Sequence, residues 1–505
     1  MTPTDARLVP LALAVWLAAG LLVGRTLPAL VVAGLAGLAA AAATARARGR
    51  RARRAGRTGL PGVVLCLLAV VAVAVVVAAD AHAARSELLA AAARTGERLT
   101  VDVRVLGAPR ALPSAWGGPV RHSVDVRVER VETGAPDAPR AERVALPASL
   151  VGTRWADVVV GERDRASVTV VARGLDGRRA RYDLRGATSP RGLAPAPALR
   201  RGAHGLRAGL RSAVVGLPPD AAGLVPGIAV GDTGAVPQDL LDAMRTTGLT
   251  HLTAVSGAHF SLVGALVLAA TSVLRLPRAA RVGATAVVLA GLVVLVGPDP
   301  SVLRAAGTGA IGLLALAVGR RGAAVPAPAA GVTVLLLLDP WLARSAGLAL
   351  SVAATAGLVV GGPIVLDGLQ GVRRWLAAAL AAPVLAQLAC APVLVLLTPS
   401  LATWSLPANI VAAPVVAPTT VLALAAALVA PVAPGVAAWL ATLAGHGAGW
   451  IAGTARTIAA WPAASLPWVP GLLGAVLLVA AEVVAVALVV RRVHRARGVG
   501  GSWDP

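Results

Sequence analysis

The chain has 505 residues, of which 57% are hydrophobic and only 14% carry a charge. With a mean hydropathy of +0.76, this composition excludes an ordinary soluble globular protein. Apolar stretches of about 18 residues or more recur along the chain, which is typical of an α-helical protein that crosses a membrane many times. The formal net charge is +23, and all 47 basic residues behind it are arginines. A compositional bias of the genome explains this excess more readily than a polyanionic partner does.

The N-terminal part, residues 1–83, is predicted to hold three membrane spans. Residues 8–24 and 28–43 form two apolar stretches joined by a short turn, and residues 60–79 form a third. Because a second span follows the first at once and no cleavage site is evident, we do not expect a cleaved signal peptide. The arginine run at 46–54 is expected to be a cytoplasmic loop by the positive-inside rule. A patch for nucleic acid or anionic lipid is the alternative.

Residues 84–197 are more polar than the rest of the chain. Hydrophobic residues, mostly valine, alternate with polar ones in the segments 99–105, 122–128 and 167–172. Alternation with a period of two, between glycine and proline turns, predicts a small antiparallel β domain of about five strands. Both cysteines of the chain lie in apolar segments elsewhere, so no disulfide is available to this domain.

Residues 189–197 are rich in proline and glycine, and we predict a linker there. The segment that follows, 198–217, is predicted to be an amphipathic helix. Its arginines are Arg200, Arg201, Arg207 and Arg211. Such a helix could lie on the outer surface of the membrane. Its arginines could instead line the approach to a pore.

The C-terminal part, residues 198–496, is predicted to be a helical bundle followed by a short tail at 497–505. Its predicted spans are residues 252–274, 279–297, 302–319, 323–338, 345–362, 376–397, 407–430, 434–457 and 470–490. If the β domain is external, the basic loops between these spans all fall on the cytoplasmic side, together with the C-terminus. We therefore predict about 12 transmembrane helices. A re-entrant pair in the proline-rich region 405–435 would change that count.

One stretch, residues 221–268, places polar side chains in an otherwise apolar segment. It contains Asp232, His251, Ser256 and His259. Unsatisfied polar groups are costly in hydrocarbon, so these side chains are expected to face protein or water. Ionisable groups at membrane depth indicate a functional site. Five further candidates in apolar surroundings are Arg304, Asp339, Ser351, Gln387 and Asn409.

Six motifs occur in this part in a fixed order. They are T-G-L-T-H-L-T-A-V-S-G-A-H (247–259), P-S-V-L-R-A (300–305), D-P (339–340), L-S-V-A-A-T (350–355), A-Q-L (386–388) and P-A-N-I (407–410). Together they resemble the signature elements of the ComEC competence-protein family, the inner-membrane channel for single-stranded DNA in natural transformation. The resemblance covers about residues 60–490, and the ordered set is far more specific than any one motif.

The resemblance implies a multi-pass protein of the plasma membrane that moves single-stranded DNA into the cytoplasm. The residues implied to line the pore or the DNA path are Asp232, His251, Ser256, Gly257, His259, Arg304, Asp339, Ser351, Gln387 and Asn409. Among them, Arg304 is the best candidate for binding phosphates, and it is expected at the outer mouth of the pore. If its role is structural instead, it is expected to pair with Asp299 or Asp339. Gly257 is expected to let a neighbouring backbone approach closely.

The strand count and the resemblance together suggest an OB-like architecture for the external β domain. Such barrels often bind single strands through aromatic side chains and a basic groove. The aromatic residues of this segment are only Trp116, Trp155 and Tyr182, and its arginines alternate with acidic residues. A structural or assembly role is therefore at least as well supported as DNA binding.

The implied partners are single-stranded DNA, membrane lipid, a separate DNA receptor, a separate nuclease and a cytoplasmic translocase ATPase. A second copy of this chain, in a homo-oligomer, is a further candidate. Long members of the family carry a metallo-β-lactamase domain with an H-x-H-x-D-H cluster. That cluster is not found here, so we expect any nuclease to be another protein. No G-x-x-x-x-G-K-[ST] loop occurs either, so energy is expected from another subunit or a gradient. Neither a cofactor nor an enzymatic activity is expected.

Three other interpretations concern the same residues or the same scaffold. His251 and His259 are about 80° apart if both lie on one helix, but they lack the spacing and carboxylates of a zinc site, so polar pore lining is favoured. The sequence A-V-S-G resembles the nucleophile motif of rhomboid-type intramembrane proteases. An intramembrane serine hydrolase using Ser256 and His446 is therefore an alternative function. A transporter of small solutes or lipids on the same scaffold is another.

Overall fold

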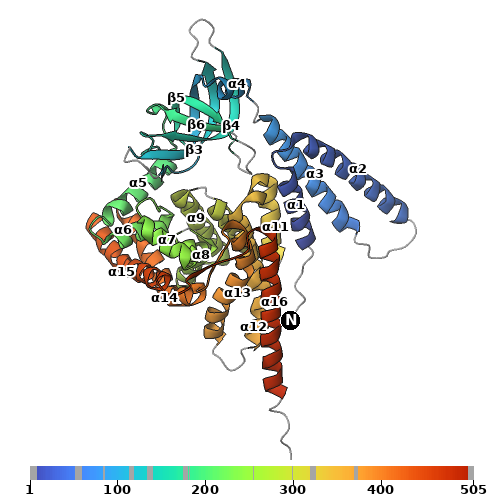
Figure 1. The fold of residues 1–505 in the computed structure, drawn as a ribbon, viewed down its shortest axis with the longest axis vertical. Helices are drawn as coiled ribbons and strands as arrows, with labels where there is room; N and C mark the ends of the chain where they lie inside the picture. The colour runs from blue at the N-terminus through green and yellow to red at the C-terminus, as the bar shows by residue number, and fades with distance from the viewer. Residues whose placement is uncertain are drawn as a thin grey trace, which may run out of the picture. The chain divides into compact units, whose positions relative to one another are not determined.

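The computed structural model describes residues 8–51, 60–83, 86–112, 119–133, 140–173, 180, 182–253, 255–297, 300–318, 326–368 and 374–498 (Figure 1). The chain divides into two compact units. The first unit comprises Met1–Val236, Leu252–Ser345 and Pro418–His446, and the second comprises Pro237–His251, Ala346–Ala417 and Gly447–Pro505.

The three predicted N-terminal spans are helices: α1 (Val9–Leu22), α2 (Thr26–Arg51) and α3 (Leu60–Ala83). Helix α3 packs against both others. The basic run expected to be a loop begins instead as the last turns of α2, because its alanine and arginine residues favour a helix. Residues 52–54 of that run lie outside the described chain.

The predicted β domain is confirmed as one sheet of seven strands rather than about five. A short helix, α4 (Glu87–Thr95), precedes it, with Ser86 as its N-cap. The strands are β1 (Arg98–Val105), β2 (Arg110–Leu112), β3 (Arg121–Thr133), β4 (Ala141–Gly152), β5 (Arg163–Ala172), β6 (Tyr182–Ala187) and β7 (Arg191–Ala194). Pairing runs β1–β3–β4–β6–β5 and returns from β5 to β1, so these five strands close into a ring. The prediction of a purely antiparallel domain was wrong, because β4 and β6 pair in parallel.

The inside of this ring is filled by large apolar residues of the alternating segments, of β4 and of the loop after β4. Leu99, Val126, Leu150, Trp155 and Val168 are completely or almost completely buried there. The Trp155 indole N–H donates to the carbonyl of Thr188 at 2.9 Å, so its polar atom is satisfied in the core. The period-two pattern therefore places its hydrophobic residues on the inner face, as expected.

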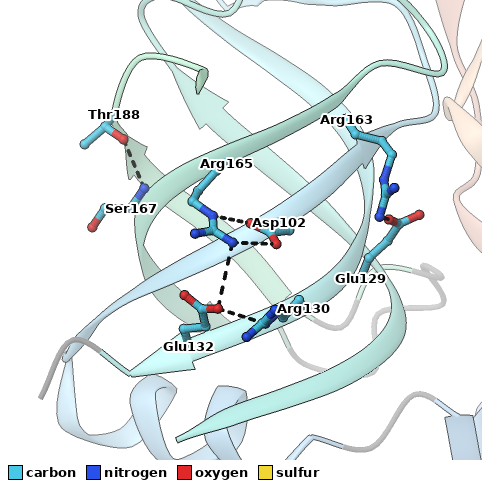
Figure 2. Close-up of polar contacts among 8 residues, drawn as sticks. All are labelled: Asp102, Glu129, Arg130, Glu132, Arg163, Arg165, Ser167 and Thr188. Atoms are coloured by element: carbon cyan, nitrogen blue, oxygen red, sulfur yellow. Dashed lines mark hydrogen bonds and ion pairs between the residues drawn. The ribbon is translucent and has the colours of Figure 1, made fainter. Parts of the chain in front are cut away.

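The outer face across β1, β3 and β5 carries paired charges (Figure 2). Arg165 donates two hydrogen bonds to the carboxylate of Asp102, at 2.6 and 2.9 Å. Arg163 pairs with Glu129 at 2.5 Å, and Arg130 pairs with Glu132 at 2.8 Å. Each of these pairs joins residues on the sheet surface, so the acidic residues neutralise much of the basic charge on this face.

The remaining chain is almost entirely helical. Its helices are α5 (Ala198–Ala213), α6 (Pro219–Val230), α7 (Gln238–Thr246), α8 (Gly257–Val273), α9 (Arg278–Val296), α10 (Pro300–Val318), α11 (Pro326–Leu338), α12 (Ala346–Gly368), α13 (Arg374–Leu397), α14 (Ser405–Val429), α15 (Pro434–Ala459) and α16 (Gly471–Gly498). Short 3₁₀ turns lie at η1 (Thr250–Leu252) and η2 (Pro340–Arg344), and two short strands, β8 (Ser400–Ala402) and β9 (Ser465–Pro467), pair with each other. The amphipathic helix predicted at 198–217 is present as α5.

Five helices of the described chain are long and apolar enough to cross a membrane. They contain or comprise Val63–Asp80, Arg278–Val296, Ala346–Pro363, Ser405–Val429 and Gly471–Leu488. Seven further helices contain or comprise shorter apolar segments of 10–17 residues. The protein is therefore a helical membrane protein with a β domain, and the predicted number of about 12 spans is not confirmed.

The proline-rich region 405–435 does not form a re-entrant pair. Helix α14 continues through Pro407, Pro414 and Pro418 without a break. Pro414 and Pro418 are both exposed. The next helix begins only after Pro431, at Pro434.

Candidate functional site

Helix α6, which was not predicted, is a short, almost fully buried helix in the first unit. Its 12 residues correspond to about 18 Å, less than the hydrocarbon thickness of a bilayer. Gly223 allows close packing on the following loop, because a Cβ there would lie 2.6 Å from the Val236 Cα. The helix ends at Gly231, whose φ of +73° is in the left-handed region favoured by glycine. The next residue is the candidate Asp232.

Asp232 pairs with an arginine of α5. Arg211 Nε donates to Asp232 Oδ2 at 2.8 Å, and the backbone N–H of Asp232 donates to the carbonyl of Pro226 at 3.3 Å. The carboxylate therefore has a charged partner close to the end of α6. This contact also gives Arg211 a structural partner, where the sequence had suggested either the membrane surface or a pore entrance.

Two more α5 arginines bind the C-terminal end of α9. Arg207 Nη1 donates to the carbonyl of Val296 at 2.9 Å, and Arg200 Nη1 reaches the carbonyl of Val294 at 3.4 Å. The last carbonyls of a helix have no partner within it, and they carry the negative end of its dipole. Arg200, Arg207 and Arg211 share one face of α5 because they are seven and four residues apart. That spacing was visible in the sequence, but the carbonyls they bind were not.

His251 and His259 do not share a helix, so the expected 80° relation was wrong. His251 lies on η1, and α8 begins only at Gly257. Its side chain is exposed, with Nδ1 3.0 Å from the carbonyl of Gly248. Since a carbonyl can only accept, Nδ1 carries a proton, and in the neutral ring Nε2 is the acceptor.

Ser256 and His259 form the N-terminal cap of α8. The backbone N–H of Ser256 donates to His259 Nδ1 at 3.1 Å, and Ser256 Oγ lies 3.1 Å from the same nitrogen. Because Nδ1 accepts, the proton of the neutral ring lies on Nε2, the opposite tautomer to that of His251. His259 is buried, so this polar pair fixes the start of the helix inside the protein.

These contacts do not favour the hydrolase alternative. The partner of Ser256 is His259 on its own helix, and the exposed His446 makes no hydrogen bond to Ser256 in the described chain. The lone pair of His259 Nδ1 is already directed at the backbone N–H of Ser256. Among the described residues there is also no group of three or more side chains that could hold a metal ion.

Gly257 does not have the role predicted for it. A Cβ at this position would meet no atom within 4 Å, so no backbone approaches it closely. Glycine here is explained by neither packing nor a left-handed conformation.

Arg304 is a buried cation on the second turn of α10. The residue is 9% exposed, and Nε and Nη1 have no hydrogen-bond partner among the described residues. No ion pair joins it to Asp339, whose carboxylate caps η2 by accepting from the Trp341 N–H at 3.1 Å. The other proposed partner, Asp299, lies outside the described residues.

The ends of four helices meet around these candidates in the first unit. Val255 and Phe260 flank the cap of α8, and they pack with Val296 of α9 and with Val302 and Ala305 of α10, on either side of Arg304. A Cβ on Gly231, at the end of α6, would lie 3.8 Å from Val255 and 3.9 Å from Val296. We call this the helix-end junction: Gly231, Asp232, Val255 to Phe260, Val296 and Val302 to Ala305.

The remaining candidates belong to the second unit. Ser351 of α12 accepts a hydrogen bond from Thr355 through its backbone carbonyl, and Asn409 of α14 donates to the Ser405 carbonyl at 2.8 Å. Both bonds stay within one helix. Gln387 is half-buried on α13. Thus Asp232, Ser256 to His259 and Arg304 come together, whereas His251, Ser351, Gln387 and Asn409 lie in the other unit.

The comparison with known families identifies the C-terminal part of the chain. Residues 228–493 match the family model described as Competence protein, which covers more than half of the sequence. No curated protein and no solved structure matches the chain. The family match begins within α6 and ends within α16, so it includes the whole helix-end junction from Gly231 onward. The chain therefore belongs to the competence-protein family, as the order of its motifs had indicated.

Proposed function

We propose that this protein is an inner-membrane channel that translocates single-stranded DNA into the cytoplasm during natural transformation. The family match supports a role in DNA uptake. The observation that carries the channel function is the buried Arg304 guanidinium at the helix-end junction. An unpaired arginine at membrane depth costs about 2.5–3.5 kcal/mol, so it is expected to serve an anion or to face water. A DNA phosphate is an anion that two guanidinium N–H groups bind well.

The helix-end junction suits a path for a polar polymer. Helix α6 is too short to cross a bilayer, and irregular backbone at membrane depth is tolerated where it is buried in protein or lines a cavity. In the proposed path, phosphates meet Arg304 and then polar groups of the α8 cap, Ser256 and His259. His251, Ser351, Gln387 and Asn409 belong to the second unit and are proposed as its own pore residues.

We further propose that the β domain is external and OB-like. The closed five-strand ring with a single parallel pair, β4–β6, supports this architecture. Its paired surface charges favour a structural or assembly role over strong DNA binding. The proposed partners are single-stranded DNA, lipid, a DNA receptor, a nuclease and a cytoplasmic translocase ATPase, and the channel itself is proposed to have no catalytic residue.

Arg304→Gln tests the channel directly. We expect DNA uptake to fall while the amount of protein in the membrane stays normal, because the side chain keeps its length and loses its charge. Arg275→Gln, an exposed arginine in the turn after α8, is the matched control and should leave uptake unchanged. Normal uptake and normal abundance in Arg304→Gln would contradict the role in phosphate binding. Reduced abundance, restored when Asp299 is also neutralised, would indicate a structural ion pair instead.

Substitutions in the α8 cap distinguish the channel from a hydrolase. Ser256→Ala should be tolerated better than His259→Ala, because His259 would still accept from the Ser256 backbone N–H. A catalytic serine would be indispensable. Loss of activity in Ser256→Ala, with normal expression and active His251→Ala and His259→Ala variants, would favour the hydrolase.

A fusion at Gly134, between β3 and β4, tests the location of the β domain. Alkaline phosphatase placed there should be active, since that enzyme folds only outside the cytoplasm, whose thiols are kept reduced. A fluorescent protein that reports the cytoplasm from the same position would overturn the proposed topology.

A further inference from the structure

Two short strands in the second unit join two pairs of helices. Strand β8 lies between α13 and α14, and β9 lies between α15 and α16. They pair antiparallel, with Leu401 opposite Leu466. The Thr403 N–H donates to the Ala464 carbonyl at 3.2 Å and extends the ladder by one bond. The ends of four helices are therefore held at one level by this small sheet.

Three tryptophans lie next to the two strands in the chain, and the indole N–H groups of two of them, Trp404 and Trp468, are satisfied. Trp404 and Trp461 make an edge-to-face contact, with ring centroids 5.4 Å apart. Trp404 Nε1 donates to the Pro462 carbonyl at 3.0 Å, and Trp468 Nε1 donates to the Gly474 carbonyl at 2.9 Å. Trp468 also packs with Leu401 against residues of α13 and α16. These contacts hold the aromatic rings in defined orientations.

The surface over β9 is apolar and exposed. Trp461, Leu466 and Val469 are 42%, 43% and 39% exposed, and we call them the β9 surface. The exposed leucines Leu472 and Leu473 follow in the chain, at the start of α16, one of the helices able to cross a membrane. An exposed apolar surface next in the chain to a membrane-spanning helix is poorly suited to bulk water.

The same sheet is equally unsuited to the hydrocarbon core. It has only two strands, so each has an edge whose backbone N–H and C=O groups have no strand partner. Open sheet edges do not occur where lipid tails surround them. Tryptophan is enriched at the level of the headgroups, where an apolar ring and a polar environment are satisfied together.

We propose that the β9 surface is an interfacial anchor that lies in the headgroup layer of the membrane. The arginines place it in the outer leaflet. Helix α13 starts at Arg374 and ends before β8, whereas α16 starts after β9 and carries Arg491 and Arg492 near its far end. In both helices the arginines lie at the end away from the sheet, and basic residues prefer the cytoplasmic side.

Spin-label accessibility measures the depth of this surface. In the full chain with Cys66→Ala and Cys390→Ala, a nitroxide is attached to Leu466→Cys or, separately, to Val469→Cys, and the protein is placed in lipid nanodiscs. Collisions with oxygen, which concentrates in hydrocarbon, are compared with collisions with a water-soluble nickel chelate. Val483→Cys, on α16 about 18 Å beyond Gly471, is the hydrocarbon control. Exposed Glu97→Cys, between α4 and β1, is the aqueous control.

We expect the ratio of oxygen to nickel accessibility at both test positions to fall between the two controls. A ratio equal to that of Val483→Cys or of Glu97→Cys would overturn the interfacial location. Low accessibility to both reagents would also overturn it, because it would mean that protein rather than lipid covers the surface. A membrane-impermeant maleimide added to intact cells should label Leu466→Cys; labelling only after lysis would overturn the outer-leaflet assignment.

Discussion

The β domain and helix α15 are built with opposite side-chain distributions. In the β domain the largest side chains are inside: Trp155, Leu99 and Leu150 are fully buried, and charged residues cover the outer face. In α15 the buried face consists mainly of small residues, such as Ala441 and Ala448. The large residues of α15 point outward, so that Trp439 is 61% exposed, together with Leu443 and Trp450.

This difference shows which solvent each region folds in. Water drives large apolar side chains inward, because burial removes their surface from it. Lipid supplies no such drive, so helices associate through close contact of small residues and leave the large ones facing the tails. The comparison predicts that the β domain is damaged by making side chains smaller, and the helices by making them larger.

The largest expected effect is that of Trp155→Ala. Loss of a buried aromatic side chain typically costs about 3–5 kcal/mol, and this one also carries a hydrogen bond to Thr188. The exposed Trp439→Ala is the matched control, with an expected change within about 0.5 kcal/mol. In the full-length protein, hydrogen exchange of the strand amides measures the effect of Trp155→Ala, and hydrogen exchange of the α15 amides measures the effect of Trp439→Ala. Equal effects in the two variants would refute the comparison.

Asp164 is an exception inside the β domain, and its effect should depend on pH. This β5 carboxylate is buried, and burial, followed by repulsion from Glu162, raises its pKa from 3.8 to about 6. Because the folded protein holds the proton more tightly, this group stabilises the fold fully below pH 3.8 and loses that contribution as the pH rises through about 6. The loss is on the order of 3 kcal/mol.

Asp164→Asn should remove this pH dependence and stabilise the β domain near neutral pH. Unfolding of the strands is followed by hydrogen exchange between pH 4 and 7 for the variant and the natural protein. The exposed Asp125→Asn serves as the control. A variant as pH-dependent as the natural protein over this range would show that Asp164 is not buried as described.

The contact between α12 and α13 tests the second half of the comparison. A Cβ on Gly357 would lie 2.7 Å from the Ala389 Cβ and 2.8 Å from the Leu385 carbonyl oxygen. Gly357→Ala should therefore force the helices apart and cost about 1–3 kcal/mol. Gly362→Ala, where a Cβ meets nothing within 4 Å, should be neutral or slightly stabilising. Thermal denaturation of the two variants in detergent, followed by size-exclusion chromatography, measures the difference. Equal melting temperatures of Gly357→Ala and Gly362→Ala would exclude close packing at Gly357.

The smallest effect is expected on the charged face of the β domain. Glu129 pairs with both Arg104 and Arg163, at 2.7 and 2.5 Å, and both arginines are exposed. Glu129→Gln should cost only about 0.2–1 kcal/mol, because water screens such pairs. Hydrogen exchange of β3 at low and high salt measures this cost, which should shrink as salt rises. A cost that does not depend on salt would point to packing rather than charge.

Local patterns predicted most of the secondary structure. Helices α1 to α3 and the β domain follow from hydropathy and from period-two alternation, which depend only on neighbouring residues. Helix α6 is not predicted by local patterns, because Pro226 and the glycines in it favour a break in the helix. Burial of the segment in the tertiary structure keeps it helical. The cap at Ser256 and His259 was also hidden, because a continuous apolar pattern does not show where a helix begins.

The amino-acid sequence by itself determined the class of protein, the presence of a β domain and the family, since composition and ordered motifs need no contact information. The tertiary structure decided which candidates meet. Arg207 binds a carbonyl 89 residues away, and Arg211 binds a carboxylate 21 residues away. It also decided that the two histidines, only eight residues apart, carry their protons on different nitrogens. Such pairings depend on how helix ends pack in three dimensions, and no local pattern encodes that packing.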